Sequence, residues 1–317
     1  MSGPKDGIIQ DFLYRGGRNN LMRILVTGAG GLIGSQVLKR LHDSGDEVFG
    51  IYRQPPIKEI AGNYSVVDLL SEDALDRLFE AGEFDAVVHC AAVLPGTSLS
   101  GIGKVSRNRE IDEVVAKFCS KLNAIGVYIS SSIVYGNDLR RAPNEGAMVP
   151  NSLMIYALQK LRGEKLFGES CSRAVSLRVC APYGPGQRNQ TVLWTFIEHA
   201  LAEQPLLYNG TGVRSQSFTH VEDIAAAIET SIYSNASGIF NIAGERDIST
   251  KELAKIVVGA VPNCKSEVRA SGQPDLQEGY RGVFDCKRAF NILNWRPRIG
   301  IEEGILQCIQ GKEIKYE

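Results

Sequence analysis

Three glycines near the start of the sequence restrict the fold more than any other feature. Gly28, Gly31 and Gly34 follow an apolar run at 22–27 and precede a stretch with helical spacing at 35–44. Glycine suits this turn because the turn is tight, the backbone can approach a pyrophosphate closely, and the helix can pack against the strand. The first N–H groups of the helix, near Leu32 and Ile33, are free to bind phosphate oxygens. The pattern therefore predicts a dinucleotide site, although a plain strand-to-helix turn can look similar.

Strand-like and helical segments alternate along the chain as far as Tyr183. Short apolar runs lie at 47–52, 65–67, 86–90, 127–130 and 174–179, with helical patterns between them at 72–79, 107–122 and 153–169. This alternation predicts an α/β fold, a doubly wound parallel (Rossmann) sheet with helices on both faces. After Tyr183 proline and glycine become frequent. We expect an N-terminal extension at 1–21, an NAD(P)-binding domain at 22–185 with a returning strand near 239–242, and a smaller C-terminal lobe at 186–317 that mainly binds substrate.

Composition excludes several classes of protein. The 317 residues carry a formal net charge of -1, so no basic field favours nucleic acid or a membrane surface. No apolar run is long enough to cross a bilayer, and the first residues lack the apolar core of a secretory signal. The seven cysteines are scattered without a close CxxC pair, which favours buried free thiols over disulfides or a metal site. We therefore expect a cytoplasmic protein that binds no metal.

The end of the second expected strand bears on which dinucleotide binds. An acidic residue there would bind the ribose 2′-hydroxyl of NAD, but this sequence has Tyr52 and Arg53. The Arg53 guanidinium can pair with the 2′-phosphate of NADP, or it is a solvated loop arginine. We expect NADP, with NAD as the alternative. Asp68 and Leu69 follow the next strand, where Asp68 can accept from the adenine amino group or, alternatively, help to cap the helix that begins near Ser71.

Tyr156 and Lys160 lie four residues apart on an expected helix, so their side chains project from one face. An ammonium beside a phenol favours the phenolate, which allows Tyr156 to exchange a proton with a carbonyl or hydroxyl group. A serine cluster, Ser130 to Ser132, ends a strand ahead of that helix. A hydroxyl at the carboxyl edge of a parallel sheet faces the cofactor crevice and can hold the reacting oxygen near the tyrosine.

Five motifs in a fixed order extend this pattern. They are TGAGGLIG (27–34), HCAA (89–92), SSSIVYG (130–136), YALQK (156–160) and LRVCAPYGPG (177–186). On these motifs the chain, from Met22 to near Ile305, resembles the extended short-chain dehydrogenase/reductase family, the nucleotide-sugar epimerase/dehydratase group. The resemblance implies that Ser131, four residues before Tyr135, is catalytic together with Tyr156 and Lys160. It also implies that Lys160 binds the nicotinamide ribose and that Ala91 and Ala92 line the cofactor.

The chain departs from this family at positions that bear on the reaction. Dehydratases carry an Asp-Glu pair after the catalytic hydroxyl residue, where this chain has Ser132 and Ile133, so 4,6-dehydration is not expected. Many members have Asn at the position of Ala181, and many read GxQxR where this chain reads GVRSQ (212–216). Residues two apart on a strand share a face, so Arg214 can still reach an anionic group. Arg281, four before Asp285, matches a phosphate-binding arginine of the family, although each arginine also fits an ordinary surface position. The candidate substrate residues are Ser132, Gln187, Arg214 and Arg281.

These features predict NADP(H)-dependent reduction of a keto-sugar that we expect to be nucleotide-linked, with a smaller substrate as the alternative. One alternative is an NAD-dependent nucleotide-sugar 4-epimerase, and another is a dinucleotide sensor without catalysis. We also expect a homodimer, because both long helices carry more apolar residues than one inward face needs: Ile111, Val114, Val115, Phe118, Cys119 and Leu122 on the first, and Leu158, Leu161, Leu166 and Phe167 on the second. The resemblance implies that these helices pair across a two-fold axis. The alternative is that both apolar stripes face the sheet.

Overall fold

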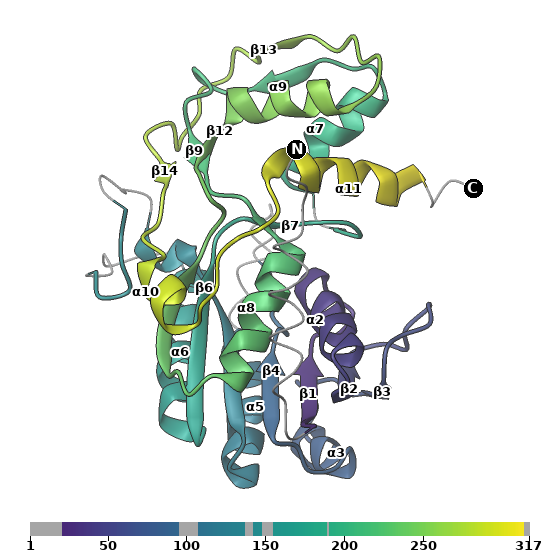
Figure 1. The fold of residues 1–317 in the computed structure, drawn as a ribbon, viewed down its shortest axis with the longest axis vertical. Coiled ribbons are helices and arrows are strands. Elements are labelled where there is room, and N and C mark those ends of the chain that lie inside the picture. Colours follow the sequence, from purple (N-terminus) through teal and green to yellow (C-terminus); the bar gives the residue numbers. More distant parts are fainter. Residues whose placement is uncertain (1–20, 95–106, 137–141, 148–154, 189, 314–317) are drawn as a thin grey trace, which may run out of the picture.

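The centre of the computed structural model is a seven-stranded parallel sheet in the order β11-β6-β5-β4-β1-β2-β3 (Figure 1). The structure describes residues 21–94, 107–136, 142–147, 155–188 and 190–313, so all of the expected extension except Leu21 lies outside it. The predicted doubly wound sheet and its returning strand are confirmed. The strands are β1 (Arg23–Thr27), β2 (Glu47–Tyr52), β3 (Asn63–Val66), β4 (Ala86–His89), β5 (Ile125–Ser131), β6 (Arg173–Val179) and β11 (Gly238–Ile242).

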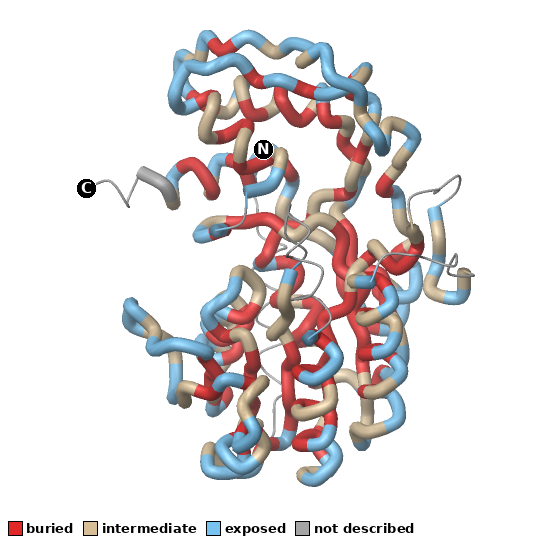
Figure 2. The backbone as a smooth tube through the Cα atoms, turned by 180° about the vertical axis from the view of Figure 1, so that it is seen from behind, coloured by how far each residue is buried: buried red, intermediate tan, exposed pale blue. Residues whose placement is uncertain are grey.

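Helices cover both faces of this sheet, because alternate strand residues point to opposite sides. Ile24 and Val26 pack in one buried cluster with α2 (Leu32–Asp43) and α8 (Val221–Tyr233). Leu25 packs in another with α3 (Ala74–Glu80), α5 (Asn108–Leu122) and α6 (Ile155–Ser170). Figure 2 shows the buried positions concentrated along the strands and the inner sides of the helices. The strand order reverses between β1 and β4, and ligands of such sheets bind in the crevice at the carboxyl ends of the strands there.

Two predicted helix starts are wrong. Helix α2 begins at Leu32 and not at Ser35, so Gly34 lies inside its first turn. Helix α3 begins at Ala74 and not at position 72, and the side chain of its N-cap Asp73 makes no capping hydrogen bond. Residues 153–154, the expected start of α6, lie outside the described ranges. The other predicted strands and helices are found, with boundaries within three residues of those expected.

A smaller part of the molecule lies beyond the carboxyl edge of the sheet and has an apolar core of its own (Figure 1). Leu193 and Phe196, Leu253 and Val257, and Ile305 fill this core from three different helices. Within the described residues, no helix is long and apolar enough to cross a membrane. The elements that follow β6, apart from α8 and β11, are β7 (Pro182–Tyr183), α7 (Val192–Leu201), β8 (Leu206–Tyr208), β9 (Ser215–Gln216), β10 (Thr219–His220), β12 (Ile248–Ser249), α9 (Thr250–Ala260), β13 (Val268–Ala270), β14 (Arg281–Gly282), α10 (Lys287–Ile292) and α11 (Ile301–Glu313).

Candidate functional site

The glycine turn is packed too closely for any side chain. Gly28 has φ +65°, and a Cβ there would lie 2.6 Å from the backbone nitrogen of Ala91. A Cβ at Gly34 would lie 2.3 Å from the carbonyl oxygen of Gly28. Gly31 donates its N–H to that same oxygen at 2.9 Å and is the N-cap of α2, with no side chain to cap the helix. The first N–H groups of α2, including those of Leu32 and Ile33, therefore remain suited to an anion such as a pyrophosphate.

The end of β2 carries one buried aromatic residue and one exposed cation. The Tyr52 ring packs near Gly30, where an added Cβ would lie 3.3 Å from Cδ1, and burial raises the pKa of this phenol. Arg53 is exposed and makes no hydrogen bond or ion pair with any other described residue. Its guanidinium is therefore available to an anionic ligand at the carboxyl end of β2.

Asp68 organises the turn that follows β3. Its Oδ1 accepts from the Leu70 N–H at 3.1 Å, and its carbonyl accepts from the N–H and the hydroxyl of Ser71 at 2.9 and 2.8 Å. This turn ends before α3, so Asp68 does not cap that helix. Leu69 is buried beside it.

Ala91 and Ala92 follow β4 at the crevice and are half-buried. The Ala91 N–H donates to the Thr27 hydroxyl at 3.3 Å, which places this segment directly against the glycine turn. Glycine is needed at position 28, because its backbone already lies in close contact with the backbone of Ala91.

The three expected catalytic residues come from neighbouring elements. Ser131 is the last residue of β5, and its Oγ accepts from the Ile133 N–H at 3.3 Å, which caps the short helix η1 (Ser132–Tyr135). Tyr156 is half-buried in the first turn of α6. Lys160, one turn later, is 5% exposed, and its Nζ lies 5.7 Å from the centre of the Tyr156 ring. That Nζ also donates to the Ile129 carbonyl at 2.7 Å, which holds it against β5. Such an arrangement can hold a substrate oxygen beside a phenol that exchanges a proton.

A buried ion pair behind this centre was not predicted from the sequence. Glu164, one turn after Lys160, accepts from Arg178 Nε at 2.8 Å and Nη2 at 2.7 Å, and from the Ser130 hydroxyl at 2.6 Å. Both charged side chains are 4% exposed. The pair ties α6 to β5 and β6. The sequence does contain a signal of this ion pair. Arg178 interrupts the apolar run of β6, and Glu164 lies on the same face of α6 as Lys160.

The polar residues expected near the substrate occupy several environments. Ser132 is buried at the start of η1 and is followed by half-buried Ile133, so neither position offers a carboxylate. Gln187 is buried, and its Nε2 donates to the hydroxyl of Thr191, the N-cap of α7, at 3.1 Å. Ala181 has φ +36°, a left-handed conformation that asparagine tolerates better than alanine does. Ala181 therefore adopts a left-handed conformation and offers no side-chain amide to a ligand.

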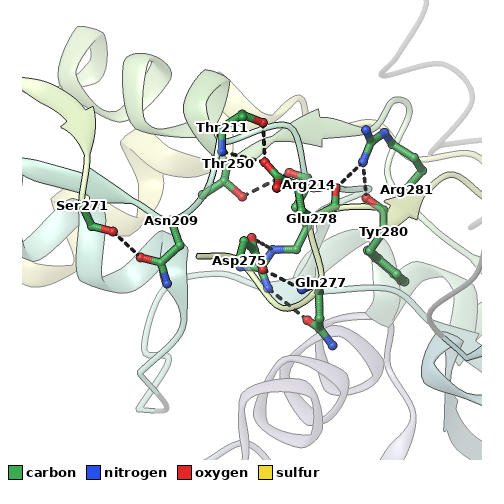
Figure 3. Close-up of polar contacts among 10 residues, drawn as sticks. All are labelled: Asn209, Thr211, Arg214, Thr250, Ser271, Asp275, Gln277, Glu278, Tyr280 and Arg281. Atoms are coloured by element: carbon green, nitrogen blue, oxygen red, sulfur yellow. Dashed lines mark hydrogen bonds and ion pairs between the residues drawn. The ribbon is translucent and has the colours of Figure 1, made fainter. Parts of the chain in front are cut away.

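The two candidate substrate arginines are held differently in the smaller part of the molecule (Figure 3). Arg214 pairs through Nε with Asp275 at 3.2 Å and donates through Nη1 to Gln277 at 3.0 Å. Arg281 donates only through Nη1, to the carbonyls of Glu278 and Tyr280 at 2.9 Å each. Its Nε and Nη2 make no hydrogen bond with another described residue. Arg281 thus keeps two donor nitrogens for an anion, whereas a carboxylate already lies within ion-pair distance of Arg214.

Comparisons with known proteins identify the family of this chain. The NAD dependent epimerase/dehydratase family matches residues 24–243. A UDP-glucuronate 4-epimerase of Thermodesulfobacterium geofontis is 24% identical over 92% of this chain and 97% of its own length. The solved structure of the Thermotoga maritima UDP-glucose 4-epimerase with UDP-glucose superposes with a TM-score of 0.84 at 22% identity, covering 93% of this chain and all of that one.

A second solved structure is similar at slightly higher identity. The protein MoeE5, in complex with UDP-glucose and NAD, has a TM-score of 0.81 and 26% identity, and the match covers 93% of this chain and 100% of that chain. The family match extends over more than half of the sequence and includes the glycine turn, Ser131, Tyr156 and Lys160. The chain therefore belongs to the NAD dependent epimerase/dehydratase family, enzymes of the extended short-chain dehydrogenase/reductase type.

Proposed function

We propose that this chain reduces a keto-sugar carried on a nucleotide, with NADPH as the hydride donor. The observation that carries the proposal is the grouping of Ser131, Tyr156 and buried Lys160 at the end of β5, on the sheet whose glycine turn fits a pyrophosphate. Bound nicotinamide would supply the hydride. The Tyr156 phenol donates the proton to the carbonyl oxygen, and the Ser131 hydroxyl orients that oxygen. Lys160 stabilises the phenolate that remains and binds the nicotinamide ribose.

We propose that residues 22–185, with β11, bind the cofactor and that residues 186–317 mainly bind the substrate. The buried Gln187 supports this assignment, and so do the Nε and Nη2 of Arg281, for which no described residue is a hydrogen-bond partner. Ser132 lies next to the catalytic serine and would contact the sugar. Arg214 contributes less, because Asp275 and Gln277 already hold its guanidinium.

Arg53 supports NADP over NAD. Its exposed guanidinium makes no hydrogen bond or ion pair with another described residue, and it lies where an NAD-binding member of this fold has a carboxylate. Asp68 and Leu69, which follow the next strand, and Ala91 and Ala92 would complete the cofactor site. Arg53→Asp should reverse the preference, because a carboxylate repels a 2′-phosphate and accepts from a 2′-hydroxyl. Dissociation constants for NADPH and NADH in both proteins decide this, and equal wild-type affinities that the substitution leaves unchanged would exclude the role.

The second candidate function is 4-epimerisation of a nucleotide sugar with bound NAD. Relatives favour it, since MoeE5 was solved with UDP-glucose and NAD and one relative is a UDP-glucuronate 4-epimerase. Dehydration is disfavoured because Ser132 and Ile133 provide no carboxylate. A sensor without catalysis is disfavoured because Ser131, Tyr156 and Lys160 are all present.

The test combines Tyr156→Phe with an assay of cofactor turnover. The variant should lose activity by roughly 10²–10⁴-fold while it still binds the cofactor, because only the proton donor is removed. A reductase consumes added NADPH in proportion to product, whereas an epimerase interconverts two sugars with none added. A variant that retained more than about a tenth of the wild-type rate would contradict the role of Tyr156.

We also propose a homodimer through the outer sides of α5 and α6. Phe118 and Phe167 are fully buried beneath the sheet, so these two residues belong to the core and not to an interface. Ile155 and Leu158 on α6 remain 40% and 48% exposed. An isologous contact would let this apolar surface bury itself against its own copy.

A further inference from the structure

A buried polar network lies directly behind Lys160. The Tyr128 hydroxyl donates to Asp112 Oδ2 at 3.0 Å, and His89 Nε2 lies 3.0 Å from Asp112 Oδ1. His89 Nδ1 lies 2.6 Å from the Thr27 hydroxyl, directly before the glycine turn. All four side chains are buried, and the His89 ring stacks on Phe167 with centres 5.4 Å apart. The network thus runs from β1 through β4 and α5 to β5.

The directions of these hydrogen bonds follow from the Asp112 carboxylate, which can only accept. His89 Nε2 therefore carries a proton and donates to Asp112 Oδ1. In the neutral imidazole Nδ1 is then the acceptor, and the Thr27 hydroxyl, which accepts from the Ala91 N–H, donates to it. Asp112 therefore receives one donor on each oxygen, which fixes the carboxylate beside Tyr128.

Lys160 has few compensating contacts for a buried ammonium. Its Nζ makes one hydrogen bond, to Ile129, and lies 4.7 Å from the centre of the Tyr128 ring. Within the described ranges, no carboxylate forms an ion pair with it. Burying an ammonium is unfavourable unless a partner compensates, and an aromatic face is such a partner. The Tyr128 ring is richer in electrons because its hydroxyl donates to a carboxylate, which strengthens this contact.

Gly163 leaves the space in which the hydrogen bond between Tyr128 and Asp112 forms. Gly163 lies inside α6, where glycine is less favourable than alanine. A Cβ there would lie 2.2 Å from the Tyr128 hydroxyl oxygen and 2.8 Å from Asp112 Oδ2. Only glycine leaves room for the Tyr128–Asp112 hydrogen bond under the helix that carries Lys160.

We propose that Tyr128 is a positioning residue for Lys160. Asp112 and His89 hold its ring beneath the ammonium, which lies close to Tyr156. This inference rests on the proposed catalytic roles of Tyr156 and Lys160. Burial, with Asp112 adding to it, raises the pKa of Tyr128 well above its usual range, so this phenol stays neutral. The other ionisable groups around the pair are Asp112 on α5, His89 and Cys90 at the end of β4, and Tyr156 and Glu164 on α6.

The pH dependence of turnover tests the inference. Tyr128→Leu removes the ring, so the ammonium is less favoured and the Tyr156 phenol keeps its proton to higher pH. The midpoint of the rate against pH should move upward by about one unit. Phe118→Leu is the matched control, since it removes a buried ring from the same cluster without touching Lys160, and its midpoint should stay in place. Tyr128→Phe keeps the ring but loses the hydrogen bond to Asp112, so its midpoint should move upward by less.

Two outcomes would overturn the inference: an unmoved midpoint in Tyr128→Leu, or equal movement in Phe118→Leu. If Tyr128→Leu does not fold, Tyr128→Phe and Asp112→Asn decide, and an unmoved midpoint in both overturns it. A substrate-free titration separates this test from the proposed function. The tyrosinate absorbance assigned to Tyr156, obtained by subtracting the matching Tyr156→Phe protein, should move to higher pH in the Tyr128 variants. Failure of the proposed function appears instead as turnover that survives Tyr156→Phe.

Discussion

Arg178→Met tests whether the buried pair with Glu164 holds α6 against the sheet. In this variant Glu164 keeps only the Ser130 hydroxyl as a donor, because the contacts at 2.8 and 2.7 Å are lost. The Glu164 side chain is 4% exposed, so water has little access to replace them. Removing one partner of a buried pair costs about 3–5 kcal/mol. We expect the free energy of unfolding in urea to fall by that amount.

The double variant Glu164→Leu/Arg178→Met separates the cost of a stranded charge from the value of the pair. It should be more stable than Arg178→Met alone, because no uncompensated charge remains. Arg162→Met is the control, since its ion pair with Glu113 is 49% and 42% exposed and should contribute at most about 1 kcal/mol. A loss below about 1 kcal/mol in Arg178→Met, or a double variant less stable than that single variant, would refute the reasoning.

Three further predictions use other parts of the structure. Gly34→Ala puts a carbon 2.3 Å from the Gly28 carbonyl oxygen and should weaken NADPH binding by about tenfold or more in a fluorescence titration. Gly168→Ala is the control and should bind NADPH normally, because its Cβ has no other atom within 4 Å. Burial lowers the pKa of His220 from 6.5 to about 4. The free energy of unfolding is therefore highest, as far as His220 is concerned, above pH 6.5, and it falls by about 3 kcal/mol as the pH drops toward 4. His220→Asn, which can still cap α8, should flatten this part of the stability curve in urea melts. Leu158→Glu should convert the proposed dimer to a species near 34.6 kDa in sedimentation equilibrium, whereas the control Leu201→Glu on α7 should leave the dimer intact. A wild-type protein that already has a mass near 34.6 kDa would exclude the dimer.

The sequence predicts the sheet well because the features that define it are local. An apolar run, a glycine turn and a helical period indicate β1 and α2 without knowledge of distant residues. The sequence places the start of α2 at Ser35 and not at Leu32, because its glycines indicate a turn. Gly34 is glycine for a different reason, since the first helical turn passes directly over the Gly28 carbonyl.

The partners within the buried networks could not be predicted, because they depend on which strands are neighbours and in what register. Arg178 meets Glu164 only because β6 lies beside β5 under α6. Periodicity likewise showed that Phe118 belongs to an apolar stripe but not which surface covers it. Arg214 was expected to be open to a ligand, yet Asp275, from a distant loop, lies 3.2 Å from it.

The position of β11 has a consequence for how the chain folds during synthesis. Strand β11 closes the edge of the sheet beside β6, yet it follows β6 in the chain only after α7, four short strands and α8 have been made. Until then the growing polypeptide exposes the apolar edge of β6, Val175 and Leu177 included, which can pair with any extended segment. A fragment that ends before Gly238 should therefore aggregate or depend on chaperones, even though it contains the glycine turn, Ser131, Tyr156 and Lys160.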